Sequence, residues 1–186
     1  MRRQWASAGL AALFAASALA ADIGGVKLAD KASVGGQELV LNGGAVRRKA
    51  IFKRYVGSLY LPGKTTDLAG VLAKGPRRIQ LNLLRDLSAD QFFDALNDGL
   101  KDNNSAAELA AVKAQVDQLT STMKSIGELK EGNVVTLDFV DGATVIALDG
   151  AAKGTIPGEP FNRALTKIWL GDKPAQADLK KAMLGG

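Results

Sequence analysis

The composition of this 186-residue chain excludes most chemistry that depends on a nucleophile or a metal. It contains no histidine and no cysteine, so it lacks Ser-His-Asp and Cys-His sites and the imidazole or thiolate ligands of zinc, copper and iron–sulfur centres. We therefore expect no cofactor and no metal site. The formal net charge of +5 comes from scattered basic pairs without interleaved aromatic residues, which argues against nucleic acid as a partner.

The first 20 residues have the order of a secretory signal. A basic start, Met1-Arg2-Arg3, precedes an apolar run that ends in the small-x-small pattern Ala18-Leu19-Ala20. The run is too short to cross a bilayer as a stable helix. We predict a signal peptide over residues 1–20, cleavage near Ala20/Ala21 and a periplasmic or secreted location, with a buried N-terminal helix as the alternative. Residues 21–186 then form a single domain with no membrane span and a core that needs no disulfide.

The first part of the mature chain reads as β-strands. Short strands are predicted at Val26–Leu28 and Gln37–Leu41, separated by a Gly35-Gly36 turn. The sequence Asn42-Gly43-Gly44 is a strong signal for a hairpin turn, because Asn and Gly tolerate the left-handed backbone of tight turns. The basic, β-prone stretch that follows, through Leu61, is then the second arm of that hairpin.

Alternation along this stretch is imperfect. From Ile51 onward, neither of the two alternating sets of side chains is purely apolar. This favours a sheet with one packed face and one partly solvated face, or a bulge between Arg47 and Phe52. Arg47 and Tyr55 share a parity, but in a straight strand they would lie roughly 26 Å apart, at about 3.3 Å per residue. They can line one cavity only if the chain bends or turns between them.

Two helices with matching start signals follow a half-buried strand at Arg77–Leu84. Each begins with a capping box, one from Ser88 to Gln91 and one from Ser105 to Glu108. They are predicted to cover residues 89–101 and 106–126. The second helix carries a continuous apolar seam that we expect to pack on the domain's own sheet, with a coiled-coil partner as the alternative.

The last part of the chain repeats the order of strands followed by helices. The pair Asp141-Gly142 predicts a hairpin between Val134–Val140 and Thr144–Leu148. A short strand at residues 151–155 and helices at residues 161–170 and 175–184 complete the chain. This order predicts an α+β domain, a largely antiparallel sheet with helices segregated on one face.

Two stretches resemble the bacterial, secreted branch of the chalcone isomerase-like family. They are N-G-G-A-V-R followed by F-K-x-Y-V-G-x-L-Y-L, within residues 42–61, and I-P-G-E-x-F-N-R-A-L-x-x-I-W-L-G-D-K-P, from residue 156. The match in motif order covers nearly all of the mature chain. The resemblance implies an open-faced β-sandwich, a large antiparallel sheet covered on one face by a layer of helices, with a ligand cleft between sheet and helices.

The resemblance also implies four ligand-binding candidates. The cleft arginine of the family falls on Arg47, with Arg48 as the alternative; the plant cleft threonine falls on Tyr55, and a polar residue of the late helix falls on Asn162. In the plant enzymes the arginine stabilises negative charge while a phenolate adds across an enone, and in fatty-acid-binding members it holds a carboxylate. A guanidinium suits both roles, because it stays charged and offers a planar fork of donors.

One feature of the plant enzymes is missing. In those enzymes a tyrosine and a lysine on one helix hold a water near the reacting carbonyl. The corresponding helix here carries Gln91, Phe92, Phe93 and Ala95 instead. Proton transfer would fall to Tyr55, Tyr60 or Lys53.

Two functions follow from these features. The first is a non-catalytic periplasmic binding protein for a small amphipathic carboxylate such as a fatty acid, held by Arg47. The alternative is an intramolecular lyase of chalcone isomerase type, with Arg47 as its catalytic residue and an enone as substrate. A third class, an envelope interaction module using the apolar seam, stays open, as does the oligomeric state. The expected partner is a small amphipathic or aromatic ligand.

Overall fold

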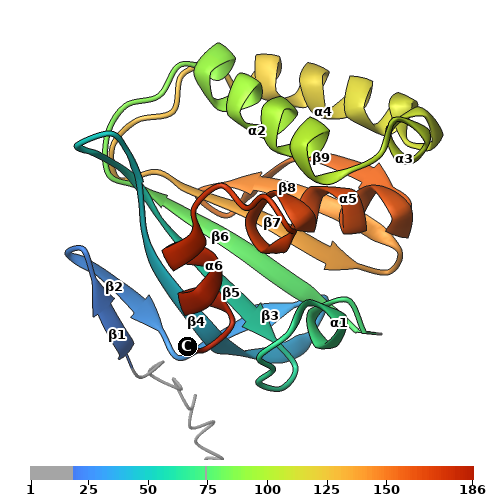
Figure 1. The fold of residues 1–186 in the computed structure, drawn as a ribbon. Helices are drawn as coiled ribbons and strands as arrows, with labels where there is room; N and C mark the ends of the chain where they lie inside the picture. The colour runs from blue at the N-terminus through green and yellow to red at the C-terminus, as the bar shows by residue number, and fades with distance from the viewer. Residues whose placement is uncertain (1–18, 74) are drawn as a thin grey trace, which may run out of the picture.

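A computed structural model describes residues 19–73 and 75–186, and its centre is a seven-stranded antiparallel sheet. Consecutive strands are neighbours throughout, in the order β3 to β9 (Figure 1). The strands are β3 (Lys31–Val34), β4 (Gln37–Lys49), β5 (Phe52–Leu61), β6 (Arg77–Leu83), β7 (Val134–Val140), β8 (Ala143–Leu148) and β9 (Ala151–Pro157). The predicted antiparallel sheet is confirmed.

The helices gather on one face of this sheet (Figure 1). They are α1 (Leu68–Val71), α2 (Ala89–Asn103), α3 (Ala106–Ala111), α4 (Lys113–Ile126), α5 (Glu159–Leu170) and α6 (Ala177–Met183). The main core lies between the two layers. Strand β6 shows how the sequence produces it, since Ile79, Leu81 and Leu83 are buried while Gln80 and Asn82, between them, are only half-buried. Within the described ranges, none of the helices is both long and apolar enough to cross a membrane.

Both predicted capping boxes are formed. The N–H of Gln91 donates to Ser88 Oγ at 3.1 Å, and the N–H of Glu108 donates to Ser105 Oγ at 3.2 Å. The prediction of one helix over residues 106–126 is wrong, because the helix breaks at Val112 (φ −114°, ψ 17°). Val112 is buried, and its packing overrides the local helix preference. The apolar seam of α4 packs into the core of its own domain.

A small hairpin covers part of the opposite face of the sheet. Strands β1 (Leu19–Ile23) and β2 (Val26–Ala29) pair with each other, and the hydroxyl of Tyr60 donates to the Ala29 carbonyl at 3.0 Å. The predicted signal peptide lies outside the described residues, except for Leu19 and Ala20, which begin β1. Cleavage and export therefore stay predictions.

The prediction of a turn at Asn42-Gly43-Gly44 is wrong, because β4 runs unbroken from Gln37 to Lys49. Asn42 lies at a bulge, where its buried amide accepts from the N–H of Thr65 and donates to the carbonyls of Thr65 and Met183. A Cβ on Gly43 would overlap the Ala182 carbonyl oxygen of α6. Gly43 therefore does not form a turn. Its missing side chain lets the backbone of α6 approach β4 closely.

Candidate functional site

Arg47 and Tyr55 lie opposite each other on neighbouring strands. The chain turns at Ala50 and Ile51, so that β4 and β5 form a hairpin in which Arg47 pairs with Tyr55. Directly paired residues project from the same face of a sheet, and for Tyr55 this is the face that carries Leu59 and the helix layer. A register shift between Arg47 and Arg48 confirms the predicted bulge. The hairpin thus brings together two side chains that a straight strand would hold far apart.

The hydroxyl of Tyr55 is buried and is hydrogen-bonded to a side chain of the helix layer. It accepts a hydrogen bond from the indole Nε1 of Trp169, in α5, at 3.0 Å. Burial raises the pKa of Tyr55 above its ordinary value of 10, while the Trp169 hydrogen bond and the charge of Arg47 oppose this rise. At neutral pH the hydroxyl therefore carries its proton, which it can donate to a ligand oxygen.

The raised pKa predicts a loss of stability in alkali that depends on Tyr55. Below pH 10 the hydroxyl is protonated in both states; above it the unfolded chain releases the proton first, so stability falls as the pH rises towards the folded pKa. We expect the free energy of unfolding of the wild type to fall more steeply above about pH 10 than that of Tyr55→Phe, by up to about 1.4 kcal/mol per pH unit. Urea titrations between about pH 9 and 11 measure both slopes. Equal slopes would contradict the burial of an un-ionised hydroxyl.

Arg47 and Arg48 have different surroundings. Arg47 is half-buried on the face of Tyr55, and no acid in the described part of the chain forms an ion pair with it. The side chain of Arg48 is exposed. Its backbone N–H donates to Gln176 Oε1 at 2.8 Å, and Gln176 Nε2 donates to the Val46 carbonyl at 3.2 Å. These bonds hold the start of α6 on β4, beside Arg47.

Helix α6 closes the layer over the two strands, in front of β4 and β5 in Figure 1. Leu179 is buried against Gly57, where an added Cβ would lie 3.3 Å from the leucine. A surface cavity of about 470 Å³ follows the other side of α6, between Thr66, Pro174 and Lys181. Neither this cavity nor a smaller one beside α1 is lined by Arg47, Tyr55 or Asn162.

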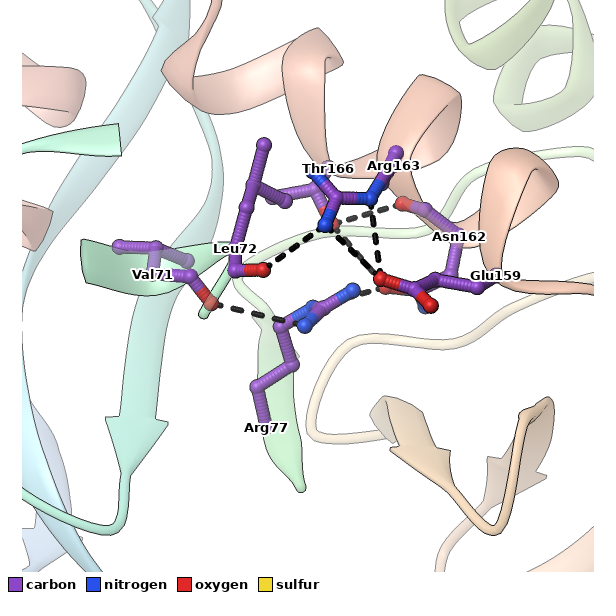
Figure 2. A network of polar contacts seen from close by, with 7 residues as sticks. All are labelled: Val71, Leu72, Arg77, Glu159, Asn162, Arg163 and Thr166. Carbon is purple, nitrogen blue, oxygen red and sulfur yellow. Dashed lines mark hydrogen bonds and ion pairs between the residues drawn. The ribbon is translucent and has the colours of Figure 1, made fainter. Parts of the chain in front are cut away.

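Asn162 lies in a separate buried network (Figure 2). Its Oδ1 accepts from Arg77 Nε at 2.8 Å, and its Nδ2 donates to Thr144 Oγ1 at 2.9 Å. Thr166 Oγ1 donates to the Asn162 carbonyl at 2.8 Å. Asn162 precedes Trp169 by two helical turns, about 10 Å along the axis of α5. The structure therefore brings Arg47 and Tyr55 together but directs Asn162 to a different residue.

That residue, Arg77, is a buried cation that the sequence reasoning did not single out. It is 2% exposed, its guanidinium lies 4.3 Å from the centroid of the Phe139 ring, and its Nη2 has no partner in the described structure. Burial lowers the pKa of Arg77 to about 10, with nearby Arg163 acting in the same direction and Glu159 opposing it. The burial of Arg77 could have been predicted from the sequence, because Arg77 lies two residues before Ile79 and so faces the same side of β6 as the buried residues.

Comparisons with known proteins agree with this architecture. A family model described as chalcone isomerase-like matches residues 20–185. Among solved structures, the chain is similar to a fatty-acid binding protein of Arabidopsis thaliana, with a TM-score of 0.62 and 14% sequence identity over 83% of this chain and 90% of that one. A comparison with the sequences of curated proteins finds no match. The match over almost the whole described chain shows that this protein belongs to the chalcone isomerase-like family.

Proposed function

We propose that this protein binds, without catalysis, a small amphipathic carboxylate such as a fatty acid, and that Arg47 holds its carboxylate. The observation that carries the proposal is the pairing of Arg47 with Tyr55 on the helix-facing side of the sheet. The guanidinium offers several donors, and the Tyr55 hydroxyl, which already accepts from Trp169, has its own proton to donate. Two donors and no acid partner form a site for an anion.

The surroundings of this pair suit an acyl chain. Tyr55, Leu59, Leu179 and Trp169 all belong to the core between sheet and helices. Because this layer is closed, an acyl chain must take the place of the contacts that α6 makes with β4 and β5. Helix α6 has 7 residues, and side chains hold its ends to β4: Gln176 at its start, and Asn42 through the Met183 carbonyl at its end. Separation of α6 would uncover Leu179 and Met183, which are buried, so the acyl chain must supply apolar contacts in their place.

Two further observations support the choice. The Arabidopsis structure with the same architecture is that of a fatty-acid binding protein. The alternative, an intramolecular lyase, needs a residue that transfers protons, and α2 presents Gln91, Phe92 and Phe93 where the plant enzymes have tyrosine and lysine. The N-terminal sequence supports an exported, periplasmic location for the carrier.

Arg47→Ala should weaken binding of a fatty acid about tenfold to a hundredfold, because hydrogen bonds to a charged group contribute about 1.5–3 kcal/mol. Calorimetric titration of the delipidated protein with a medium-chain fatty acid measures the loss. Lys124→Ala, which removes an exposed charge from α4, is the control and should leave the affinity unchanged.

Three results would contradict the proposal. Equal affinities of the wild type and Arg47→Ala would show that Arg47 does not hold the carboxylate, and a loss in Arg48→Ala alone would move the site to its exposed neighbour. Cyclisation of a chalcone by the wild type, abolished in Arg47→Ala, would show that the protein is an enzyme of the lyase type and not a carrier. Native mass spectrometry of the protein as purified gives an independent measurement, since a carrier should retain an endogenous acid that Arg47→Ala loses.

A further inference from the structure

The turn between β4 and β5 exposes two large apolar side chains. Ile51 is 83% exposed and Phe52 is 50% exposed, and they are the exposed large hydrophobic residues of the described chain. Single apolar residues on a surface are common, but these two are adjacent and lie at the convex end of a hairpin. In Figure 1 this turn projects at the left edge, beside the loops that join β6 to α2 and α4 to β7.

Basic residues surround this tip. Between Asn42 and Leu61 the hairpin contains five, Arg47, Arg48, Lys49, Lys53 and Arg54, and no acid. None of the five forms an ion pair within residues 19–73 and 75–186. The guanidinium of Arg85, in the loop after β6, adds a sixth positive charge 4.7 Å from the centroid of the Phe52 ring.

The loops beside the tip also contain acids, but in the described structure none of them forms an ion pair with the hairpin. Asp86 and Glu128 both form ion pairs with Lys130, at 3.3 and 2.8 Å. The N–H of Glu131 also donates to Asp86 at 2.8 Å. Because the basic residues of the hairpin form no ion pair in the described structure, their charge is available to an external anion.

We propose that the β4–β5 tip docks on the surface of a bilayer that contains anionic phospholipid. Ile51 and Phe52 enter the interface between headgroups and acyl chains, and the flanking lysines and arginines bind headgroup phosphates. A protein partner fits these observations less well, since a stable interface buries about 800 Å² on each side, far more than a two-residue tip offers. A deformable anionic surface complements both the charge and the convex shape.

Docking at this tip has a consequence for the candidate ligand site. Arg47 precedes the turn residue Ala50 by three positions, about 10 Å along a strand. The tip therefore brings the Arg47–Tyr55 pair close to the source of acyl ligands. Docking itself does not rest on the proposed carrier function, because the exposed residues of the tip, Lys49, Ile51, Phe52 and Lys53, are not part of the ligand site.

Flotation of the full-length protein with vesicles tests the proposal. We expect binding to vesicles of equal parts phosphatidylglycerol and phosphatidylcholine, little binding to phosphatidylcholine alone, and weaker binding as salt screens the charges. Lys49→Gln/Lys53→Gln should reduce partitioning about 25-fold, or about fivefold for each charge removed. Ile51→Ser/Phe52→Ser should reduce it at least about tenfold, because both side chains lose an apolar environment.

The control variant Lys124→Gln/Lys153→Gln removes the same charge from exposed sites on α4 and β9, and should bind as the wild type does. All of these proteins share one N-terminus, so any contribution from residues 1–20 is common to them. Unchanged binding in either tip variant, an equal loss in the control variant, or equal binding to neutral vesicles would overturn the proposal.

The docking proposal and the proposed carrier function can be contradicted independently of each other. Tyr55→Phe changes the ligand site without changing the charge, so it should bind vesicles as the wild type does. Ile51→Ser/Phe52→Ser should retain its affinity for a soluble fatty acid when vesicles are absent. Loss of vesicle binding in Tyr55→Phe would show that binding goes through the ligand site and not through the tip.

Discussion

Replacing Asn162 with leucine should lower the free energy of unfolding by about 3–5 kcal/mol, the usual loss when one partner of a buried charge is removed. Leucine has a similar volume but no acceptor for Arg77 Nε, which now donates to Asn162 Oδ1. The guanidinium would keep the Phe139 ring and a long contact of 3.5 Å to the Val71 carbonyl. Because Arg77 Nη2 already lacks a partner in the described structure, little remains to compensate the buried charge.

The matched variant is Arg77→Met, which removes the charge together with its need for an acceptor. It leaves the neutral Asn162 Oδ1 without the Arg77 donor, so it should cost about 1–3 kcal/mol, less than Asn162→Leu, which leaves a charge unpaired. The double variant Arg77→Met/Asn162→Leu should then recover much of the stability lost in Asn162→Leu. Urea unfolding of the four proteins gives the coupling energy of the pair. Additive losses would show that the two side chains do not depend on each other.

The second large effect is expected at Gly43. Gly43→Ala should cost about 3 kcal/mol, because a methyl group added at a packed position forces backbone shifts. Here the overlapping atom is the carbonyl oxygen of Ala182, which α6 cannot rotate away as it could a side chain. We expect α6 to separate from β4, with faster hydrogen exchange of the amides of residues 180–184 as the local signature.

Gly63→Ala is the control for this change. Nothing lies within 4 Å of a Cβ at Gly63, and its backbone is not in the left-handed region. The control should therefore unfold at the same urea concentration as the wild type or slightly above it. A Gly43→Ala protein as stable as the control, with α6 protected from exchange, would show that the contact with Ala182 relaxes without cost.

Much of the fold was predictable because its signals are local. A capping box involves residues three positions apart, and both boxes appear in the structure as the sequence predicts. The Asp141-Gly142 pair forms the turn between β7 and β8, and the alternation of β6 marks its buried face. The two motifs that resemble the chalcone isomerase-like family led to the right family and fold.

The candidate site was only partly predictable. The motif pointed to Arg47 and Tyr55, but the expected turn was placed before Arg47, at Asn42-Gly43-Gly44. The actual turn at Ala50 has few of the usual residues, since Ala50 takes a positive φ of 54° where Asn or Gly is preferred. That one change of turn decides whether the two side chains lie far apart or opposite each other.

The sequence by itself determined the start signals of two helices, the faces of the central strands and the family to which the chain belongs. Each depends on residues a few positions apart, or on motifs that survive as a linear pattern. The tertiary structure alone decided that Gly43 makes room for α6 and that Asn162 binds Arg77, 85 residues away along the chain. Contacts of this kind depend on which distant segment lies opposite, because a glycine or a buried amide has the same local preferences whatever it faces.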